Sequence, residues 1–226
     1  SNFRRKLMIE RNLLAIKNNI SKVCKNYQRN IDDINIVAVS KTIATEKIEE
    51  AINVGIKNFG ENYIKEAKEK WPTLKAKYPE IKLHFIGHLQ SNKVKDAFTI
   101  FDCIQSVDSK NLALEIVKNQ NKFQKKMPIF IQINIGNEDQ KSGIKIEEAK
   151  EFINFCKSDL ELEVKGLMAV PPNSINPSPF FALLKNIAME NNLHELSMGM
   201  SADYEEAIAL GSNYIRIGTA LFGSRI

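Results

Sequence analysis

The chain has 226 residues, of which 43% are hydrophobic and 26% are charged, and its formal net charge is +5. This composition is ordinary for a soluble globular protein, and the length suits one large domain or two small ones. No apolar run approaches the roughly 20 residues of a membrane span, and no apolar stretch typical of a secretory signal follows the basic N-terminus. We therefore expect a cytoplasmic protein that is not attached to a membrane.

Residue types that commonly bind metals are sparse. The three cysteines are widely spaced and form no CxxC pair, which predicts buried, reduced thiols and neither a zinc site nor a disulfide framework. His84 and His88 are four residues apart, but Gly87 and the strand-like KLHFI segment argue against a helical metal-binding pair. Basic residues are spread through Lys/Glu-rich segments, which is typical of solvated helix faces. We expect neither a metal nor a nucleic-acid partner.

The hydrophobic pattern alternates between strand-like and helix-like segments after a first amphipathic helix at about residues 5–27. Strands are predicted for 35–39, 57–60, 82–87, 101–107, 128–136, 163–170, 193–199 and 213–218. The helical segments that follow them are predicted for 45–55, 61–71, 91–98, 109–122, 145–157, 179–192, 202–211 and 219–223.

These eight strand–helix units predict the fold. Alternation of this kind favours a parallel sheet, because each parallel return needs a crossover. Eight units in a chain of this length favour a closed (β/α)8 barrel, that is, a TIM barrel. We expect a single domain over residues 1–226, with the helix in about 1–30 packed on the barrel. The proline-rich segment 173–179 is interpreted as a rim loop, not as a linker between domains.

Lys41 stands just past the first predicted strand. Active sites of such barrels lie at the C-terminal ends of the strands. An amine near apolar walls has a lowered pKa and can act as a nucleophile toward an aldehyde. A lysine in a surface loop is the alternative, and position alone does not decide between them.

The last two strands carry a second candidate feature. Phosphate sites in such barrels are often built from the loops after strands 7 and 8. Here Ser201 offers a hydroxyl and Asp203 can cap the next helix, while Gly218 and Thr219 open a short helix with free N–H groups. Helix capping alone also explains these residues. Because strand 8 closes against strand 1, a phosphate held there would lie beside Lys41.

Arg216 lies in the last strand, two residues before Gly218, so both share one face of that strand. If this face points into the barrel, the guanidinium needs a partner. A lysine Schiff base beside a phosphate site is what pyridoxal 5′-phosphate requires. The pyridine nitrogen of that cofactor is one candidate partner for Arg216, and a carboxylate inside the barrel is the other.

Eight segments in order, between about residues 36 and 223, carry a family resemblance. They read AVSKT, FGENYIKEA, HFIGHLQSNKVK, QSVDS, NIGNEDQKSG, GLMAVPP, LSMGMSADYEEAI and YIRIGTALFG. Together they resemble the pyridoxal phosphate homeostasis proteins, whose barrel is shared with the N-terminal domain of alanine racemase.

The resemblance implies roles for particular residues. Lys41 would carry pyridoxal 5′-phosphate as a Schiff base, and Arg216 would face the pyridine nitrogen. The residues implied to hold the phosphate are Ser201, Gly218 and Thr219, and those implied to line the pocket are Asn62 and Met200. His88, Asn92 and Lys93 would lie near the rim, where a solvated helix start explains them equally well. Lys141 is a second candidate lysine near the pocket mouth, or else a solvated loop residue.

Three functions follow from these residues. We expect a binding protein that holds the cofactor on Lys41, buffers the free aldehyde and passes it to apo-enzymes, without robust catalysis. The alternative is a small amino-acid racemase. A cation at Arg216 weakens the ring as an electron sink, and we expect no further domain to supply the second acid/base of a two-base racemase. A Schiff-base aldolase is the least favoured. In alanine racemases a further domain contributes to the dimer interface. Because we expect no such domain here, we expect a monomer.

Overall fold

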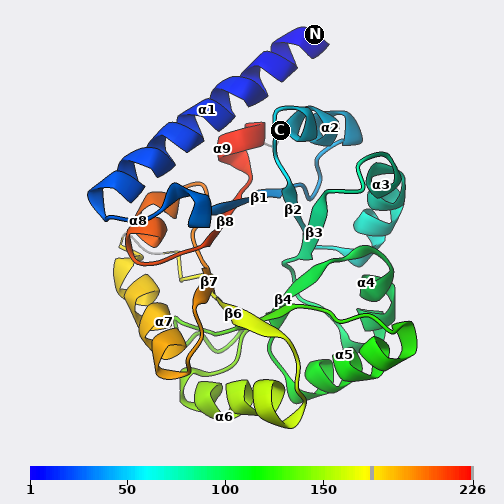
Figure 1. Cartoon of the computed structure of the whole chain (residues 1–226), viewed down its shortest axis with the longest axis vertical. Coiled ribbons are helices and arrows are strands. Elements are labelled where there is room, and N and C mark those ends of the chain that lie inside the picture. The colour runs from blue at the N-terminus through cyan, green and yellow to red at the C-terminus, as the bar shows by residue number, and fades with distance from the viewer. Residues whose placement is uncertain (174–175, 225–226) are drawn as a thin grey trace.

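The computed structural model describes residues 1–173 and 176–224 and shows a closed barrel of eight parallel strands ringed by helices (Figure 1). Each strand pairs with the next, and β8 pairs with β1 to close the barrel. The strands are β1 (Asn35–Val39), β2 (Asn58–Glu61), β3 (Lys82–Phe85), β4 (Cys103–Val107), β5 (Ile129–Gln132), β6 (Val164–Met168), β7 (Glu195–Ser197) and β8 (Tyr214–Ile217). The predicted (β/α)8 barrel is confirmed.

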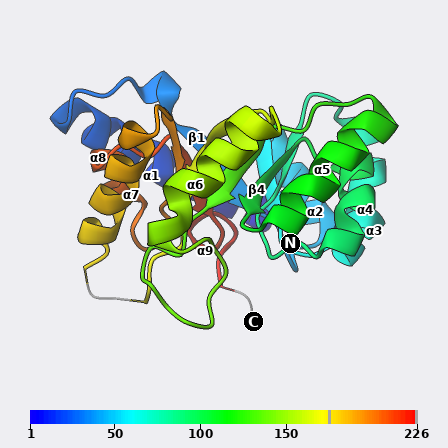
Figure 2. The same ribbon diagram turned by 90° about the horizontal axis from the view of Figure 1, so that it is seen from below.

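The helices are α1 (Asn2–Asn26), α2 (Thr45–Asn53), α3 (Ile64–Lys77), α4 (Val94–Ile100), α5 (Lys110–Phe123), α6 (Ala149–Asn154), α7 (Ser178–Glu190), α8 (Tyr204–Ala209) and α9 (Thr219–Phe222). Helices α2 to α8 connect consecutive strands and cover the outside of the barrel, while α1 precedes β1 and α9 follows β8 (Figure 2). None of the helices within these described ranges is both long enough and apolar enough to cross a bilayer.

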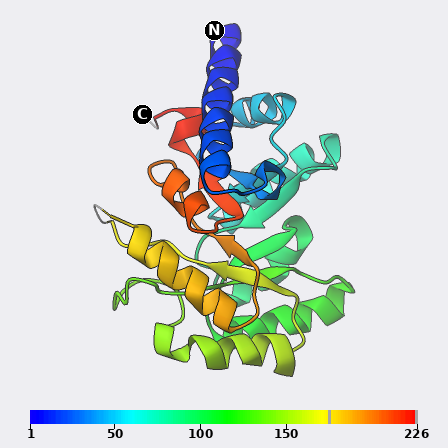
Figure 3. The same ribbon diagram turned by 60° about the vertical axis from the view of Figure 1, so that its left-hand side comes forward.

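The first helix, α1, packs against α2, α8 and α9 on the outside of the barrel (Figure 3). Its buried apolar stripe repeats at helical spacing through Ile9, Leu13, Ile16 and Ile20. Asn12 Nδ2 also donates a hydrogen bond to the carbonyl oxygen of Leu221 at 2.8 Å. This bond ties α1 to α9, and therefore to the end of the barrel at which the chain leaves β8.

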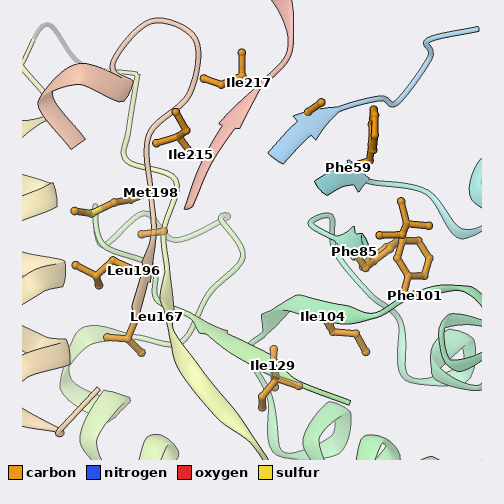
Figure 4. Close-up of a cluster of buried hydrophobic side chains, with 14 of the residues drawn as sticks. Phe59, Phe85, Phe101, Ile104, Ile129, Leu167, Leu196, Met198, Ile215 and Ile217 are labelled. Carbon is orange, nitrogen blue, oxygen red and sulfur yellow. The ribbon is translucent and has the colours of Figure 1, made fainter. Parts of the chain in front are cut away.

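Side chains alternate between the two faces of each strand, as the period of a strand requires. The outward layer packs under the helices and includes Phe59, Ile104, Leu167 and Ile215 (Figure 4). The inward layer contains a smaller buried cluster, made of Val37, Cys103, Phe130, Met168 and Tyr214. Polar side chains share this inward face, and they position the site described below.

Several element boundaries differ from the sequence prediction; the predicted helix 61–71, for example, is α3 and extends to Lys77. The predicted strand 101–107 begins at Cys103, because the Phe101 N–H donates to the Ala97 carbonyl oxygen and so closes α4. The predicted helix 145–157 is a 3₁₀ turn, then α6, then a π-helical turn at Phe155–Asp159. The predicted strand 128–136 ends at Gln132. The proposed rim loop 173–179 includes residues 174 and 175, which lie outside the described residues.

Candidate functional site at the carboxyl ends of the strands

Lys41 lies directly beyond the C-terminal end of β1, in a tight turn from Ser40 to Ile43. The Ile43 N–H donates to the Ser40 carbonyl oxygen at 3.0 Å, and the Ser40 N–H donates to the Gly60 carbonyl oxygen at 2.9 Å. Thr42 has a φ of 61°, a left-handed conformation that is costly for a β-branched residue. The backbone beside Lys41 is therefore strained, and such a conformation persists only where its surroundings impose it.

A buried ion pair behind the turn supplies that support. Lys70 Nζ lies 2.8 Å from Glu61 Oε2, and the Glu61 side chain is fully buried. Lys70 Nζ also donates to the Ser40 carbonyl oxygen at 2.7 Å, next to Lys41 in the chain. Glu66 Oε2 accepts from both Lys70 Nζ and the Thr42 N–H, each at 2.6 Å. Lys70 Nζ donates as well to the Ile43 carbonyl oxygen at 3.3 Å, so the cluster of Glu61, Glu66 and Lys70 anchors the turn at three backbone positions.

The loops after β7 and β8 meet at the same end of the barrel. Ser201 Oγ accepts a hydrogen bond from the Ala220 N–H, in the first turn of α9, at 3.1 Å. A Cβ added to Gly199 would lie 2.6 Å from the Ala207 Cβ, so glycine permits the β7–α8 loop to approach α8 closely. The register of β1 and β8 pairs Ala38 with Ile217. Lys41 and the Ser201–Ala220 contact therefore follow directly from two neighbouring strands.

Asp203 does not cap the helix that follows it, although the sequence suggested that it could. Asp203 takes the N-cap position of α8, but its Oδ1 accepts from the Met200 N–H at 2.7 Å and caps no helical N–H. The Asp203 side chain therefore closes the loop and does not cap the helix. Met200 is 46% exposed, and Thr219 is also exposed.

Arg216 points into the barrel, a direction that the sequence left open, and it is 4% exposed. Its Nη1 donates to Ser197 Oγ at 2.6 Å and its Nη2 donates to the Ala169 carbonyl oxygen at 2.9 Å. Burial lowers the pKa of Arg216 to about 10, against the opposing charge of Asp203, so the guanidinium remains charged at neutral pH. Among the described residues no carboxylate lies within ion-pair distance of it. Its direct partners are neutral.

From Arg216 a chain of hydrogen bonds crosses the barrel interior. Ser197 Oγ donates to Gln105 Oε1 at 2.6 Å, and Gln105 Nε2 donates to His84 Nδ1 at 3.1 Å. Because an amide nitrogen only donates, His84 carries its proton on Nε2, which donates to Asn58 Oδ1 at 2.9 Å. We call these five residues the interior polar chain. All its donors point from the carboxyl ends toward the amino ends of the strands, so the chain is polarised in one direction.

The other predicted residues lie toward the rim. Asn62, His88 and Lys93 line one cavity of about 590 Å³ between α3 and α4. Lys41 and the residues of β8 are not among the residues that line this cavity. The Oδ1 atom of Asn62 is buried and has no hydrogen-bond partner within the described ranges. Asn92 is exposed in a short 3₁₀ turn.

Lys141 is exposed in the loop that follows β5. Its backbone N–H donates to the Glu138 carbonyl oxygen at 3.2 Å. The structure therefore does not bring Lys141 to the Lys41 turn through any hydrogen bond or ion pair that involves the described residues. No group of three or more metal-ligating side chains is found in the described part of the chain.

The chain is similar to known proteins over almost its whole length. Residues 12–226 match the family described as alanine racemase, N-terminal domain. A pyridoxal phosphate homeostasis protein of Aquifex aeolicus is 37% identical over 222 residues, which cover 94% of this chain and 96% of the relative. The chain belongs to the pyridoxal phosphate homeostasis protein family. A member from Escherichia coli K12 is 34% identical over 226 residues, which cover 96% of this chain and 97% of that protein.

Solved structures agree with this family membership. PipY of Synechococcus elongatus, whose structure has pyridoxal phosphate bound, has a TM-score of 0.83 and 28% identity, covering 95% of this chain and all of that one. An alanine racemase of Corynebacterium glutamicum has a TM-score of 0.71 at 14% identity, covering 97% of this chain and 61% of that one. At that identity the racemase shares the fold of the family, and the likeness extends no further.

Sequence reasoning missed the groups that support the site. Glu61 and Lys70 lie on different elements, and only the packing of α3 against the end of β2 brings them together. His84, Gln105 and Ser197 are polar residues at buried positions of their strands. That pattern was a usable signal, because a polar side chain on a buried strand face needs a partner.

The Lys70 anchor leads to a stability prediction. We expect Lys70→Met to lower the free energy of unfolding by about 3–5 kcal/mol, because it leaves the Glu61 carboxylate buried and unpaired. The double variant Glu61→Gln/Lys70→Met should recover part of this loss. Urea denaturation measures both, with Lys65→Met, an exposed lysine on the same helix, as control. Equal stabilities of Lys70→Met and Lys65→Met would contradict the anchoring role.

The buried His84 leads to a prediction about pH. Burial lowers the pKa of His84 from its ordinary 6.5 to about 4, so between these values the unfolded chain binds a proton that the folded protein does not. The free energy of unfolding should therefore fall as the pH drops from 6.5 to 4, by on the order of 3 kcal/mol from this residue. Urea denaturation across this range should show a weaker pH dependence in His84→Gln than in the exposed-residue control His194→Gln. Identical slopes would contradict it.

Proposed function

We propose that this protein binds pyridoxal 5′-phosphate covalently at Lys41 and serves to store it and deliver it to apo-enzymes. The observation that carries the proposal is the closure of β8 on β1, which sets the Lys41 turn beside the Ser201–Ala220 contact. Family membership supports the choice of pyridoxal 5′-phosphate as the ligand, because a relative of the same fold is known with pyridoxal phosphate bound.

The residues present fit this cofactor. A phosphate would accept hydrogen bonds from the Ser201 hydroxyl and from N–H groups at the start of α9, beginning with Gly218 and Thr219. The orphaned acceptor Asn62 Oδ1 and the partly exposed Met200 side chain fit a bound ligand. Arg216, with two neutral partners, keeps further N–H donors for the pyridine nitrogen.

The chemistry at Lys41 is a condensation that balances without any further reactant. Lys41 Nζ attacks the aldehyde carbon, a C=N bond forms, and the carbonyl oxygen leaves as water. The reaction is reversible, so hydrolysis returns the free lysine and the free aldehyde. A protein that binds in this way can hold a reactive aldehyde at low free concentration and release it on demand. We expect the protein to act in this way as a monomer.

Arg216 is the reason for proposing storage and not robust catalysis. A pyridoxal cofactor stabilises carbanions best when its ring nitrogen is protonated. A guanidinium that stays charged at neutral pH disfavours a proton on an adjacent nitrogen. The ring would therefore be a weak electron sink in this site, which suits binding and release.

The attachment site can be tested directly. Purified protein loaded with pyridoxal 5′-phosphate should show the visible absorption band of a Schiff base, and borohydride should fix the cofactor on the peptide that contains Lys41. Lys41→Ala should lose essentially the whole band, and the matched control Lys141→Ala should retain it. Mass spectrometry of the reduced protein identifies the modified lysine. A wild type that cannot be loaded, or a label on Lys141, would contradict the assignment.

A second experiment separates storage from amino-acid racemisation. The loaded protein is incubated with L-alanine and with other L-amino acids, and the products are analysed on a chiral column. We expect no D-enantiomer above the level seen with Lys41→Ala, because Arg216 weakens the electron sink. Appreciable D-enantiomer that depends on Lys41 would favour the alternative function, a small racemase on the same barrel.

A further inference from the structure

The opposite end of the barrel contains a cavity that the proposed function does not use. It has a volume of about 370 Å³ and opens where the strands begin. Its lining includes the first residues of four strands: Asn58 of β2, Lys82 of β3, Cys103 of β4 and Tyr214 of β8. We call it the amino-end cavity. It is separated from the Lys41 turn by the length of the barrel.

Four lysines line this cavity, Lys82, Lys125, Lys126 and Lys165. Lys82 and Lys126 are exposed, and neither has an ion-pair partner within 4 Å among the described residues. Lys125 Nζ donates to two backbone carbonyls, those of Phe98 and Phe101, and forms no ion pair within 4 Å among the described residues. The cavity therefore holds at least three cations that no carboxylate neutralises directly.

The two acidic groups that contact the lysines of the cavity region, Asp102 and Glu195, are each engaged by one of them, while Glu163 is exposed beside Lys165. Asp102 also lines the cavity, but its Oδ2 lies 2.6 Å from Lys75 Nζ and accepts the Leu83 N–H at 2.8 Å. Glu195 lies 3.7 Å from Lys165, and both side chains are about one-third exposed. Four lysines against one lining carboxylate give the cavity a positive balance of charge. Burial lowers the pKa of Lys125, Asp102 opposes this shift, and the neighbouring Lys75 and Lys82 add to it.

Uncharged side chains also line the cavity, and they are of two kinds, aromatic rings and hydrogen-bonding groups. Phe130 and Tyr214 form an edge-to-face aromatic pair with centroids 5.2 Å apart. His84 and Asn58, the last two members of the interior polar chain, also line the cavity. Because Asn58 Oδ1 accepts from His84, its amide N–H₂ is the final donor of that chain. The chain runs from a buried cation at one end of the barrel to an N–H donor in the cavity at the other.

We propose that the amino-end cavity is a binding site for a small phosphate-bearing anion. Several lysines around one opening act as separate point charges, which suits a multiply charged tetrahedral group. The lining contains no arginine, whose planar fork is the common partner of carboxylates. The aromatic floor would contact the carbon body of the ligand, and the volume limits that body to a small metabolite.

The test titrates the folded protein with pyrophosphate and, in parallel, with citrate, using isothermal titration calorimetry. We expect pyrophosphate to bind more tightly than citrate. The double variant Lys82→Gln/Lys126→Gln should weaken pyrophosphate binding by roughly tenfold or more, since each lysine removed takes away a charge-assisted contact. The matched control Lys22→Gln/Lys118→Gln has the same net charge and changes exposed lysines outside the cavity.

Nuclear magnetic resonance locates the bound anion without any variant. Pyrophosphate should shift the backbone amide signals near residues 82, 126 and 165, at the amino ends of the strands. Shifts confined to residues 201 and 218–220 would place the anion at the proposed cofactor site and would overturn this inference. Tighter binding of citrate, or equal weakening in the two double variants, would overturn it as well. Loading at Lys41 is measured separately, so failure of either proposal can be recognised independently.

Discussion

The pairing of β8 with β1 is the constraint on which the rest of this structure depends. It closes the sheet, with Val37 opposite Arg216 and Ala38 opposite Ile217. Residues from the two ends of the chain thereby become neighbours at the carboxyl end of the barrel. An open sheet of the same strands would leave the Lys41 turn without the β8 loop beside it. The same closure directs Arg216 inward, where a buried guanidinium must find partners.

The barrel contains two polar systems that differ in position and in charge. Only the first of them supplies a partner for Arg216. Inside, Arg216 begins a chain of neutral acceptors and donors that runs to Asn58. Outside, the charged pair of Glu61 and Lys70 holds a turn whose backbone is strained at Thr42. If either system lost one of its hydrogen-bond or ion-pair partners, stability would fall, because an unpaired polar group costs free energy in a low-dielectric interior. Of these two systems, only the pair of Glu61 and Lys70 contacts the turn that carries Lys41.

Sequence reasoning reached the fold because the evidence for it is local and repeated. Eight alternations of strand and helix are visible without any knowledge of contacts. The period of a strand puts Arg216 and Gly218 on one face of the last strand, but it does not say whether that face points inward. The sequence also placed Lys41 directly after the first strand, but its role as the cofactor lysine stays a prediction. The sequence did not predict the boundary at Phe101 or the division of segment 145–157. A capping hydrogen bond sets the first and a π-helical turn sets the second, and packing decides both.

The supporting groups of the site were beyond such reasoning for a different reason. Glu61 and Lys70 are nine residues apart, but their contact depends on how α3 sits against β2. The links from Ser197 to Gln105 and from Gln105 to His84 join residues that are 92 and 21 positions apart. A single sequence shows that these residues are polar and lie in strands. It does not show which of them meet across the barrel.

The central claim is that the β1 and β8 ends together form one cofactor site. The most direct measurement is a crystal structure of the protein grown with pyridoxal 5′-phosphate. The account predicts continuous density from Lys41 Nζ to the cofactor, with the phosphate against Ser201 and the start of α9 and the ring nitrogen facing Arg216. Density joined to another lysine, or a cofactor bound outside the barrel end formed by β1 and β8, would contradict it.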